Sequence, residues 1–146
     1  MKVKVTPSKV HGNVKIPASK SMAHRALICA SLSDGTSLVS NVTNSKDIEA
    51  TVGCMKALGA IIKQIDGTTY EVTGTNLFKQ EGNITCNANE SGSTLRFLIP
   101  LAACTNAKVK FLGQGRLLQR PMDVYANEFK KQNIEFNQSD KEIIVS

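Results

Sequence analysis

Two halves of the sequence carry the same order of helix and strand signals. A shift of about 72 residues places Ser21 on Ser93 and the segment 70–72 on 143–145. Each half reads helix, strand, helix, strand, turn, strand. Because one such unit cannot bury both faces of its helices and its sheet, the two units are expected to pack against each other. The repeat therefore predicts an α/β (α+β) fold built from repeated units.

Apolar periodicity and turn residues place the elements of each unit. The predicted helices are 21–32, 46–58, 92–103 and 121–132. The predicted strands are 3–5, 14–16, 36–42, 61–65, 69–72, 108–112, 134–137 and 142–145. The first unit is expected at about 17–74 and the second at about 83–146, which leaves the strands of residues 1–16 in front of both units.

The composition is that of a soluble globular domain. The chain has 146 residues, of which 41% are hydrophobic. It has no apolar run near the roughly 20 residues that span a bilayer, and its N-terminus lacks a signal-peptide pattern. We therefore expect a cytoplasmic protein with no membrane partner. The four cysteines are scattered and there are two histidines, which argues against a metal site and favours buried thiols at Cys29 and Cys54.

The chain is basic, with a formal net charge of +6 and a pI near 9.3. Such a balance suits either nucleic acid or a small anionic substrate. Aromatic residues are 5% of the chain and none is interleaved with the basic clusters, which weakens a base-stacking surface. The location of the positive charge is therefore the informative question.

The first predicted helix begins with groups that favour an anion. Ser19 is placed to cap the helix, whose free backbone N–H groups and dipole attract negative charge, and Lys20 adds a full positive charge. Ser21 and Arg25 are four residues apart and so share one helix face. The three side chains can converge on one carboxylate or phosphate. The alternative is a solvated basic face behind an ordinary cap.

The helix of the second unit begins at Gly92, where a ligand can approach the backbone amides closely. Ser93 is a candidate cap or donor. Arg96 lies one turn further on, and Glu90 is placed to hold it in a salt bridge. The alternative is a capped core helix, because the segment that follows is strongly apolar.

A third basic segment precedes the last predicted helix. Pro121 suits the first position of a helix, which places Arg120 directly before that helix. Arg116 and Arg120 could reach back over the first two helix starts. The alternative is an exposed basic loop. Taken together, the three segments favour a small ligand with several anionic groups, and the residues themselves do not name it.

At these positions the sequence resembles the family of 3-phosphoshikimate 1-carboxyvinyltransferase, also called 5-enolpyruvylshikimate-3-phosphate (EPSP) synthase. The segments that carry the resemblance are "SKSMAHRAL", "ESGSTLRFL" and "QRPM", in family order and spacing, and the resemblance covers essentially the whole chain. It implies two lobes, each made of three βαβαββ units around buried helices. This chain would be an N-terminal fragment with two of the three units of the first lobe, and residues 1–16 would belong with the other lobe.

The resemblance also implies an activity and a site. The enolpyruvyl group of phosphoenolpyruvate would pass to the 5-hydroxyl of shikimate 3-phosphate with release of phosphate, and no metal or organic cofactor would be required. Lys20 would be catalytic and contact both substrates. Ser21 and Arg25 would bind shikimate 3-phosphate, and Gly92 and Arg120 would bind phosphoenolpyruvate.

Two features depart from the family pattern. Glu90 stands where asparagine is usual, and with Ser93 and Arg96 it is expected to support the site without contacting substrate. The family's enzymes are about three times as long as this chain, so it would carry half of the site, be inactive alone, and need the C-terminal lobe. The longer parent is expected to be a monomer, and Gly92 implies that glyphosate inhibits it.

Two other families remain as alternatives. The related UDP-N-acetylglucosamine enolpyruvyl transferase has lysine and asparagine where this chain has Lys20 and Ser21, so Ser21 argues against it. A basic nucleic-acid-binding α/β module would also suit the net charge, although the resemblance favours small-molecule partners and no nucleic acid.

Overall fold

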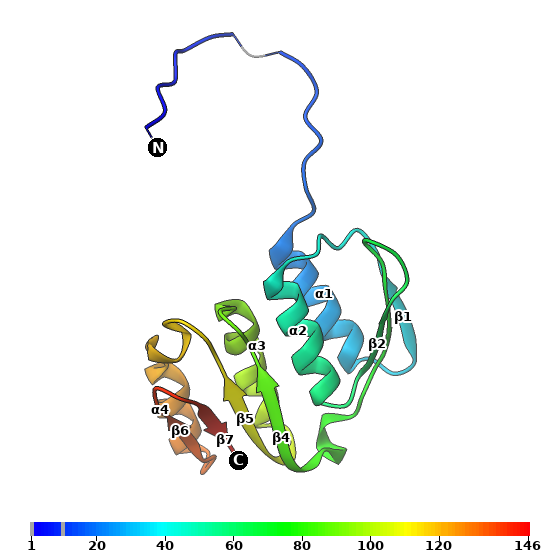
Figure 1. Cartoon of the computed structure of the whole chain (residues 1–146). Coiled ribbons are helices and arrows are strands. Elements are labelled where there is room, and N and C mark those ends of the chain that lie inside the picture. The colour runs from blue at the N-terminus through cyan, green and yellow to red at the C-terminus, as the bar shows by residue number, and fades with distance from the viewer. Residues whose placement is uncertain (1, 10) are drawn as a thin grey trace.

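The structure is a computed structural model that describes residues 2–9 and 11–146. An extended N-terminal segment runs away from a body in which helices pack against two sheets (Figure 1). The α/β fold expected from the repeated pattern is confirmed.

The first unit forms a three-stranded antiparallel sheet covered by two helices. Its elements are α1 (Lys20–Leu32), β1 (Thr36–Val39), α2 (Lys46–Ala57), β2 (Ile61–Gln64) and β3 (Tyr70–Thr73). The strand order is β1-β3-β2. Val72 in the central strand pairs with Ser37 on one side and with Ile62 on the other, and its side chain is fully buried under the helices.

The second unit repeats this arrangement and adds one strand. Its elements are η1 (Leu77–Lys79), β4 (Glu81–Asn87), α3 (Gly92–Ala102), β5 (Asn106–Leu112), η2 (Leu117–Gln119), α4 (Asp123–Lys131), β6 (Phe136–Gln138) and β7 (Ile143–Val145). The strand order is β4-β5-β7-β6. Strands β4 and β5 are parallel and the other pairs are antiparallel. Thus β5-β7-β6 matches β1-β3-β2, and β4 is the additional strand.

The core lies where the helices of the two units meet. Helices α1, α2 and α3 contact one another, and α2 also packs on β4. Helix α3 is the most apolar of the three, and its Leu95, Leu98 and Ile99 side chains are completely buried. The three helices run in the same direction, so their N-terminal turns lie at the same end of the body (Figure 1).

Several expectations from the sequence are wrong in detail. The segments 3–5 and 14–16 form no strands, and their apolar side chains are exposed, with Val3 at 71% and Ile16 at 83%. A strand requires a hydrogen-bonded neighbour, and no described residue pairs with either segment. Residues 1 and 10 of the expected N-terminal unit lie outside the described residues. Cys29 is exposed rather than buried, whereas Cys54 is buried.

Candidate anion-binding site

The first turn of α1 has the cap and the positive charge that its sequence predicts. The Ser19 side chain accepts a hydrogen bond from the backbone N–H of Met22 at 3.4 Å. Lys20 forms an ion pair with Asp47, in the first turn of α2, with 2.5 Å between Nζ and Oδ2. The Lys20 side chain is 54% exposed, and an ion pair this open to solvent contributes only about 0–1 kcal/mol. A bound anion can therefore compete with Asp47 for Lys20.

Arg25 extends from α1 onto α3. Its Nη1 donates a hydrogen bond to the carbonyl oxygen of Ser21 at 2.8 Å. Its guanidinium carbon lies 4.8 Å from the centroid of the Phe97 ring, a cation–π contact that orders the guanidinium. Arg25 thus contacts Ser21 through the backbone carbonyl oxygen, and the convergence of the Lys20, Ser21 and Arg25 side chains on one anion stays a prediction. Phe97 holds Arg25 beside the first turns of α3.

The start of α3 is built differently from the prediction. Its cap is Ser91, whose side chain accepts from the backbone N–H of Thr94 at 3.3 Å, while Ser93 is exposed. A β-carbon added to Gly92 would overlap Nη1 of Arg120 and would lie 3.5 Å from Nη1 of Arg96. Two guanidinium groups therefore flank the glycine at the N-terminus of this helix, where the backbone amides also favour negative charge.

Arg120 reaches Gly92 from a loop that is pinned by the sheet. Helix α4 begins at Asp123 rather than at Pro121, so Arg120 follows η2 and does not directly precede a helix. The Nε2 amide of Gln138, in β6, donates to the carbonyl oxygens of Leu118 at 2.7 Å and of Arg120 at 2.9 Å. These two bonds hold the extended backbone from which the Arg120 side chain projects.

Glu90 does not form the expected salt bridge with Arg96. Its Oε1 lies 2.7 Å from the place that a β-carbon of Gly115 would occupy. Beside it, the backbone N–H of Gln114 donates to the carbonyl oxygen of Asn89 at 2.6 Å. Glu90 therefore lies against the loop between β5 and η2, and the hydrogen bond joins that loop to the start of α3.

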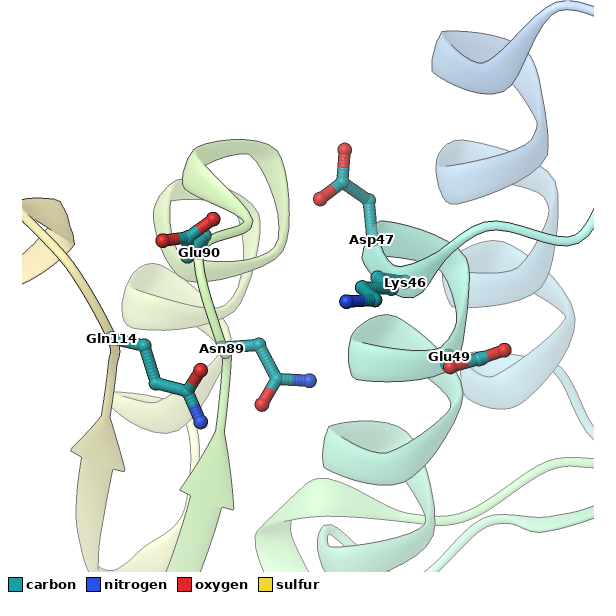
Figure 2. Close-up of a pocket in the computed structure, with 6 residues that line it drawn as sticks. All are labelled: Lys46, Asp47, Glu49, Asn89, Glu90 and Gln114. Carbon is teal, nitrogen blue, oxygen red and sulfur yellow. The ribbon is translucent and has the colours of Figure 1, made fainter.

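An open cleft of about 450 Å³ separates the start of α2 from these loops. Figure 2 shows the residues that line it, with Lys46 and Asn89 extending toward each other and Glu49 turned to the other side of α2. The lining residues are Lys46, Asp47, Glu49, Asn89, Glu90 and Gln114. Three of the six are acidic and one is basic, so the lining lacks the surplus of positive charge that an anion site needs. The anion site is thus defined by the helix starts and their cations, not by the cleft.

Comparison with known proteins decides the family. A sequence profile described as EPSP synthase (3-phosphoshikimate 1-carboxyvinyltransferase) matches residues 4–146. The chain belongs to the EPSP synthase family. Its segments "SKSMAHRAL", "ESGSTLRFL" and "QRPM" therefore supply the three basic elements of an EPSP synthase-family chain, and the structure places all three around the starts of α1 and α3.

Named relatives agree with the EPSP synthase assignment. A 3-phosphoshikimate 1-carboxyvinyltransferase from Clostridium perfringens is 47% identical over 97% of this chain and 33% of its own length. One from Clostridium kluyveri is 49% identical over 90% of this chain and 30% of its own. An EPSP synthase structure from Acinetobacter baumannii has a TM-score of 0.78 at 18% identity, over 92% of this chain and 32% of that one, and shares the fold. The chain spans about a third of the relatives it matches.

Three residues beside the candidate site were not selected from the sequence because their partners are distant along the chain. They are Asp47, which pairs with Lys20; Phe97, whose ring lies against Arg25; and Thr51, which contacts Thr94 between α2 and α3. Within residues 2–9 and 11–146 no cluster of three or more metal-ligating side chains occurs. None of the helices in that part of the chain is long and apolar enough to span a membrane.

Proposed function

We propose that the protein to which this chain belongs transfers the enolpyruvyl group of phosphoenolpyruvate to the 5-hydroxyl of shikimate 3-phosphate and releases phosphate. Membership of the EPSP synthase family supports this, and one observation carries it at the site. The Arg120 guanidinium lies where a β-carbon of residue 92 would be, at the N-terminus of α3, and Arg96 adds a second guanidinium there. A phosphate there would meet backbone N–H groups, the helix dipole and a bidentate cation together.

Each substrate is assigned to one side of this arrangement. Shikimate 3-phosphate would bind Lys20, Ser21 and Arg25 on the exposed face of α1, with Arg25 oriented by the ring of Phe97. Phosphoenolpyruvate would bind the backbone of Gly92 and the side chain of Arg120. Ser93, Arg96 and Glu90 would shape the surroundings without contacting the reacting atoms.

Lys20 is the proposed catalytic residue because the family resemblance implies that it contacts both substrates, and its ammonium already extends from α1 to Asp47 at the start of α2. In the reaction the 5-hydroxyl oxygen loses its proton and adds to C2 of phosphoenolpyruvate while C3 gains a proton. Phosphate then leaves C2 as C3 loses a proton, which restores the double bond in the product. Negative charge moves onto the departing phosphate, and a neighbouring ammonium and guanidinium stabilise such charge. Lys20 must exchange Asp47 for substrate to act in this way.

The chain supplies one side of the proposed site, and a second lobe would close it. The exposed apolar side chains of Val3, Val5, Val14 and Ile16, which are 71–87% accessible, support the assignment of residues 1–16 to that lobe. Burying exposed apolar side chains against a neighbouring sheet is favourable, by roughly 25 cal/mol per Å² of apolar surface removed from water. We propose that the complete protein acts as a cytoplasmic monomer and that glyphosate inhibits it by occupying the phosphoenolpyruvate position.

The test is complementation. The purified 146-residue chain, given both substrates, is expected to release no phosphate above background. Addition of the remaining two thirds of the Clostridium perfringens relative should restore turnover that Lys20→Met and Arg120→Ala abolish. Turnover by the chain alone would contradict the proposal that it holds half a site. Restored turnover that is insensitive to millimolar glyphosate would contradict the assignment of Gly92.

A binding experiment separates this function from the nucleic-acid alternative. Titration with shikimate 3-phosphate should perturb the amide resonances of Lys20, Ser21 and Arg25 and should saturate. Salt-dependent gel shifts of short oligonucleotides at micromolar concentration, without saturable binding of shikimate 3-phosphate, would favour a nucleic-acid-binding module instead.

A further inference from the structure

A chain of hydrogen bonds runs through the interior behind the site and connects α1, α2 and α3. The Nδ1 atom of His24 lies 2.7 Å from the Thr51 hydroxyl oxygen. That hydroxyl oxygen lies 2.7 Å from the hydroxyl of Thr94, which in turn lies 2.7 Å from the hydroxyl of Ser91. All four residues are buried, with exposures of 0–2%. Each step but the last crosses from one helix to the next.

The direction of these hydrogen bonds follows from counting protons, because each hydroxyl has one to donate. Thr94 donates to Ser91, since the geometry allows only that direction. The Thr94 proton is then occupied, so Thr51 must donate in the contact with Thr94. The Thr51 proton is then occupied as well, so His24 must donate from Nδ1. The longer contacts of both threonines to the Asp47 carbonyl oxygen, 3.3 Å each, are secondary.

This direction determines the state of His24. With the proton on Nδ1, the neutral ring has a lone pair on Nε2, and Nε2 is a buried atom without a hydrogen-bond partner among the described residues. An imidazolium would place an unpaired N–H and a charge there, which is far more costly than an unpaired lone pair. Lys20 and Arg25, on the same helix, oppose the charge, while Asp47 on α2 favours it. Burial outweighs Asp47 and keeps the ring neutral.

We propose that this one-way chain aligns the first turns of the three helices, so that His24 and Thr51 are positioning residues for the proposed two-substrate site. His24 stands directly before Arg25 and one turn after Lys20. Thr51 stands one turn after Asp47, and Ser91 directly precedes Gly92. The four-membered chain therefore connects the backbone segments that carry each proposed substrate contact of α1 and α3. The existence of the hydrogen-bond chain rests on hydrogen-bond geometry alone, and its role in substrate binding rests on the proposed function.

The existence of the hydrogen-bond chain can be tested without any ligand. Long-range proton–nitrogen correlation spectra of the labelled 146-residue chain at pH 7.5 should show His24 neutral and protonated at Nδ1. A proton at Nε2, or a ring that is charged at that pH, would overturn the proposed direction. In the same samples, Thr51→Val should shift the amide resonances of Lys20 and Gly92, on the neighbouring helices, whereas Thr51→Ser should not.

A matched control separates alignment from a general loss of buried hydrogen bonds. The Ser31 hydroxyl is fully buried and donates to the Leu27 carbonyl oxygen at 2.7 Å within α1. It is not part of the hydrogen-bond chain. Ser31→Ala should lower the free energy of unfolding as Thr51→Val does, yet leave the Lys20 and Gly92 resonances in place. Equal shifts in Ser31→Ala and Thr51→Val would refute the proposed alignment.

The role in the site is measured separately with phosphoenolpyruvate as the probe. Thr51→Val should weaken binding about three- to tenfold, the range of one neutral hydrogen bond, and Thr51→Ser should restore it. Unchanged affinity in Thr51→Val would overturn the positioning role. If the wild-type chain binds neither phosphoenolpyruvate nor inorganic phosphate while the His24 tautomer and the resonance shifts are as expected, the proposed function fails and the hydrogen-bond chain stands.

Discussion

Replacing Gly92 with alanine should separate binding from stability in this chain. The new β-carbon would overlap Nη1 of Arg120 and lie 3.5 Å from its guanidinium carbon. The guanidinium must then move by roughly 1 Å to regain ordinary van der Waals separations. Because it is the end of a flexible side chain, the fold accommodates the shift at little cost. Loss of one charge-assisted hydrogen bond to phosphate costs about 1.5–3 kcal/mol. Affinity for phosphoenolpyruvate should therefore fall about ten- to hundredfold.

The assay is an NMR titration of the chain with phosphoenolpyruvate, which measures weak binding, together with urea denaturation. The control is Gly53→Ala in α2, where an added β-carbon meets no atom within 4 Å. Both variants should keep or raise the free energy of unfolding, by up to about 1 kcal/mol for the helix-interior glycine. Only Gly92→Ala should lose affinity. Unchanged binding in Gly92→Ala, or equal losses in the two variants, would refute the contact between Arg120 and the bound phosphate.

Three further variants test the fold. Gly74→Ala should destabilise the chain by several kcal/mol in urea denaturation, because its β-carbon would overlap the backbone carbonyl of Ser33, which cannot move away as a side chain can; a wild-type midpoint would contradict this. Leu98→Ala should cost about 2–5 kcal/mol, since the side chain is fully buried in α3, and a loss below 1 kcal/mol would show that the core is loosely packed. Burial lowers the pKa of His24 below its ordinary 6.5, so the unfolded chain binds a proton more readily and the free energy of unfolding should fall as pH drops below about 6.5. His24→Asn should remove that part of the pH dependence, and an identical pH profile in the variant would contradict it.

The helices were the most predictable part of the fold. Predicted and observed ends differ by at most two residues, because regular apolar stripes mark the helices. Ser19 caps α1 as predicted, whereas the caps at Ser45 and Ser91 were not predicted. Strand β4 was not predicted. Ile84 and Cys86 are its only apolar residues in alternation, and Gly82 has a φ of +79°, so its strand character comes from parallel pairing with β5. The strands expected within 1–16 failed for the opposite reason, since alternation alone provides no hydrogen-bonding neighbour.

The candidate site was predictable as a set of residue types and not as a set of contacts. Lys20, Arg25 and Gly92 could be selected because helix starts and spacing restrict what their side chains can do. The partners that orient these residues, such as Asp47 and Phe97, lie 27 and 72 positions away in sequence numbering from Lys20 and Arg25. A contact over such a separation depends on how helices pack, and local patterns do not encode it.

The two sheets differ by one strand, and the first sheet therefore has an unpaired edge at β1. Strand β5 has a parallel neighbour on one side and an antiparallel neighbour on the other. Its counterpart β1 pairs, among the described residues, with β3 alone. The outer backbone amides and carbonyls of Thr36–Val39 therefore form a template on which another extended chain can align. This chain should therefore self-associate through the β1 edge as its concentration rises, and replacing the exposed Leu38 with a charged residue should prevent that association.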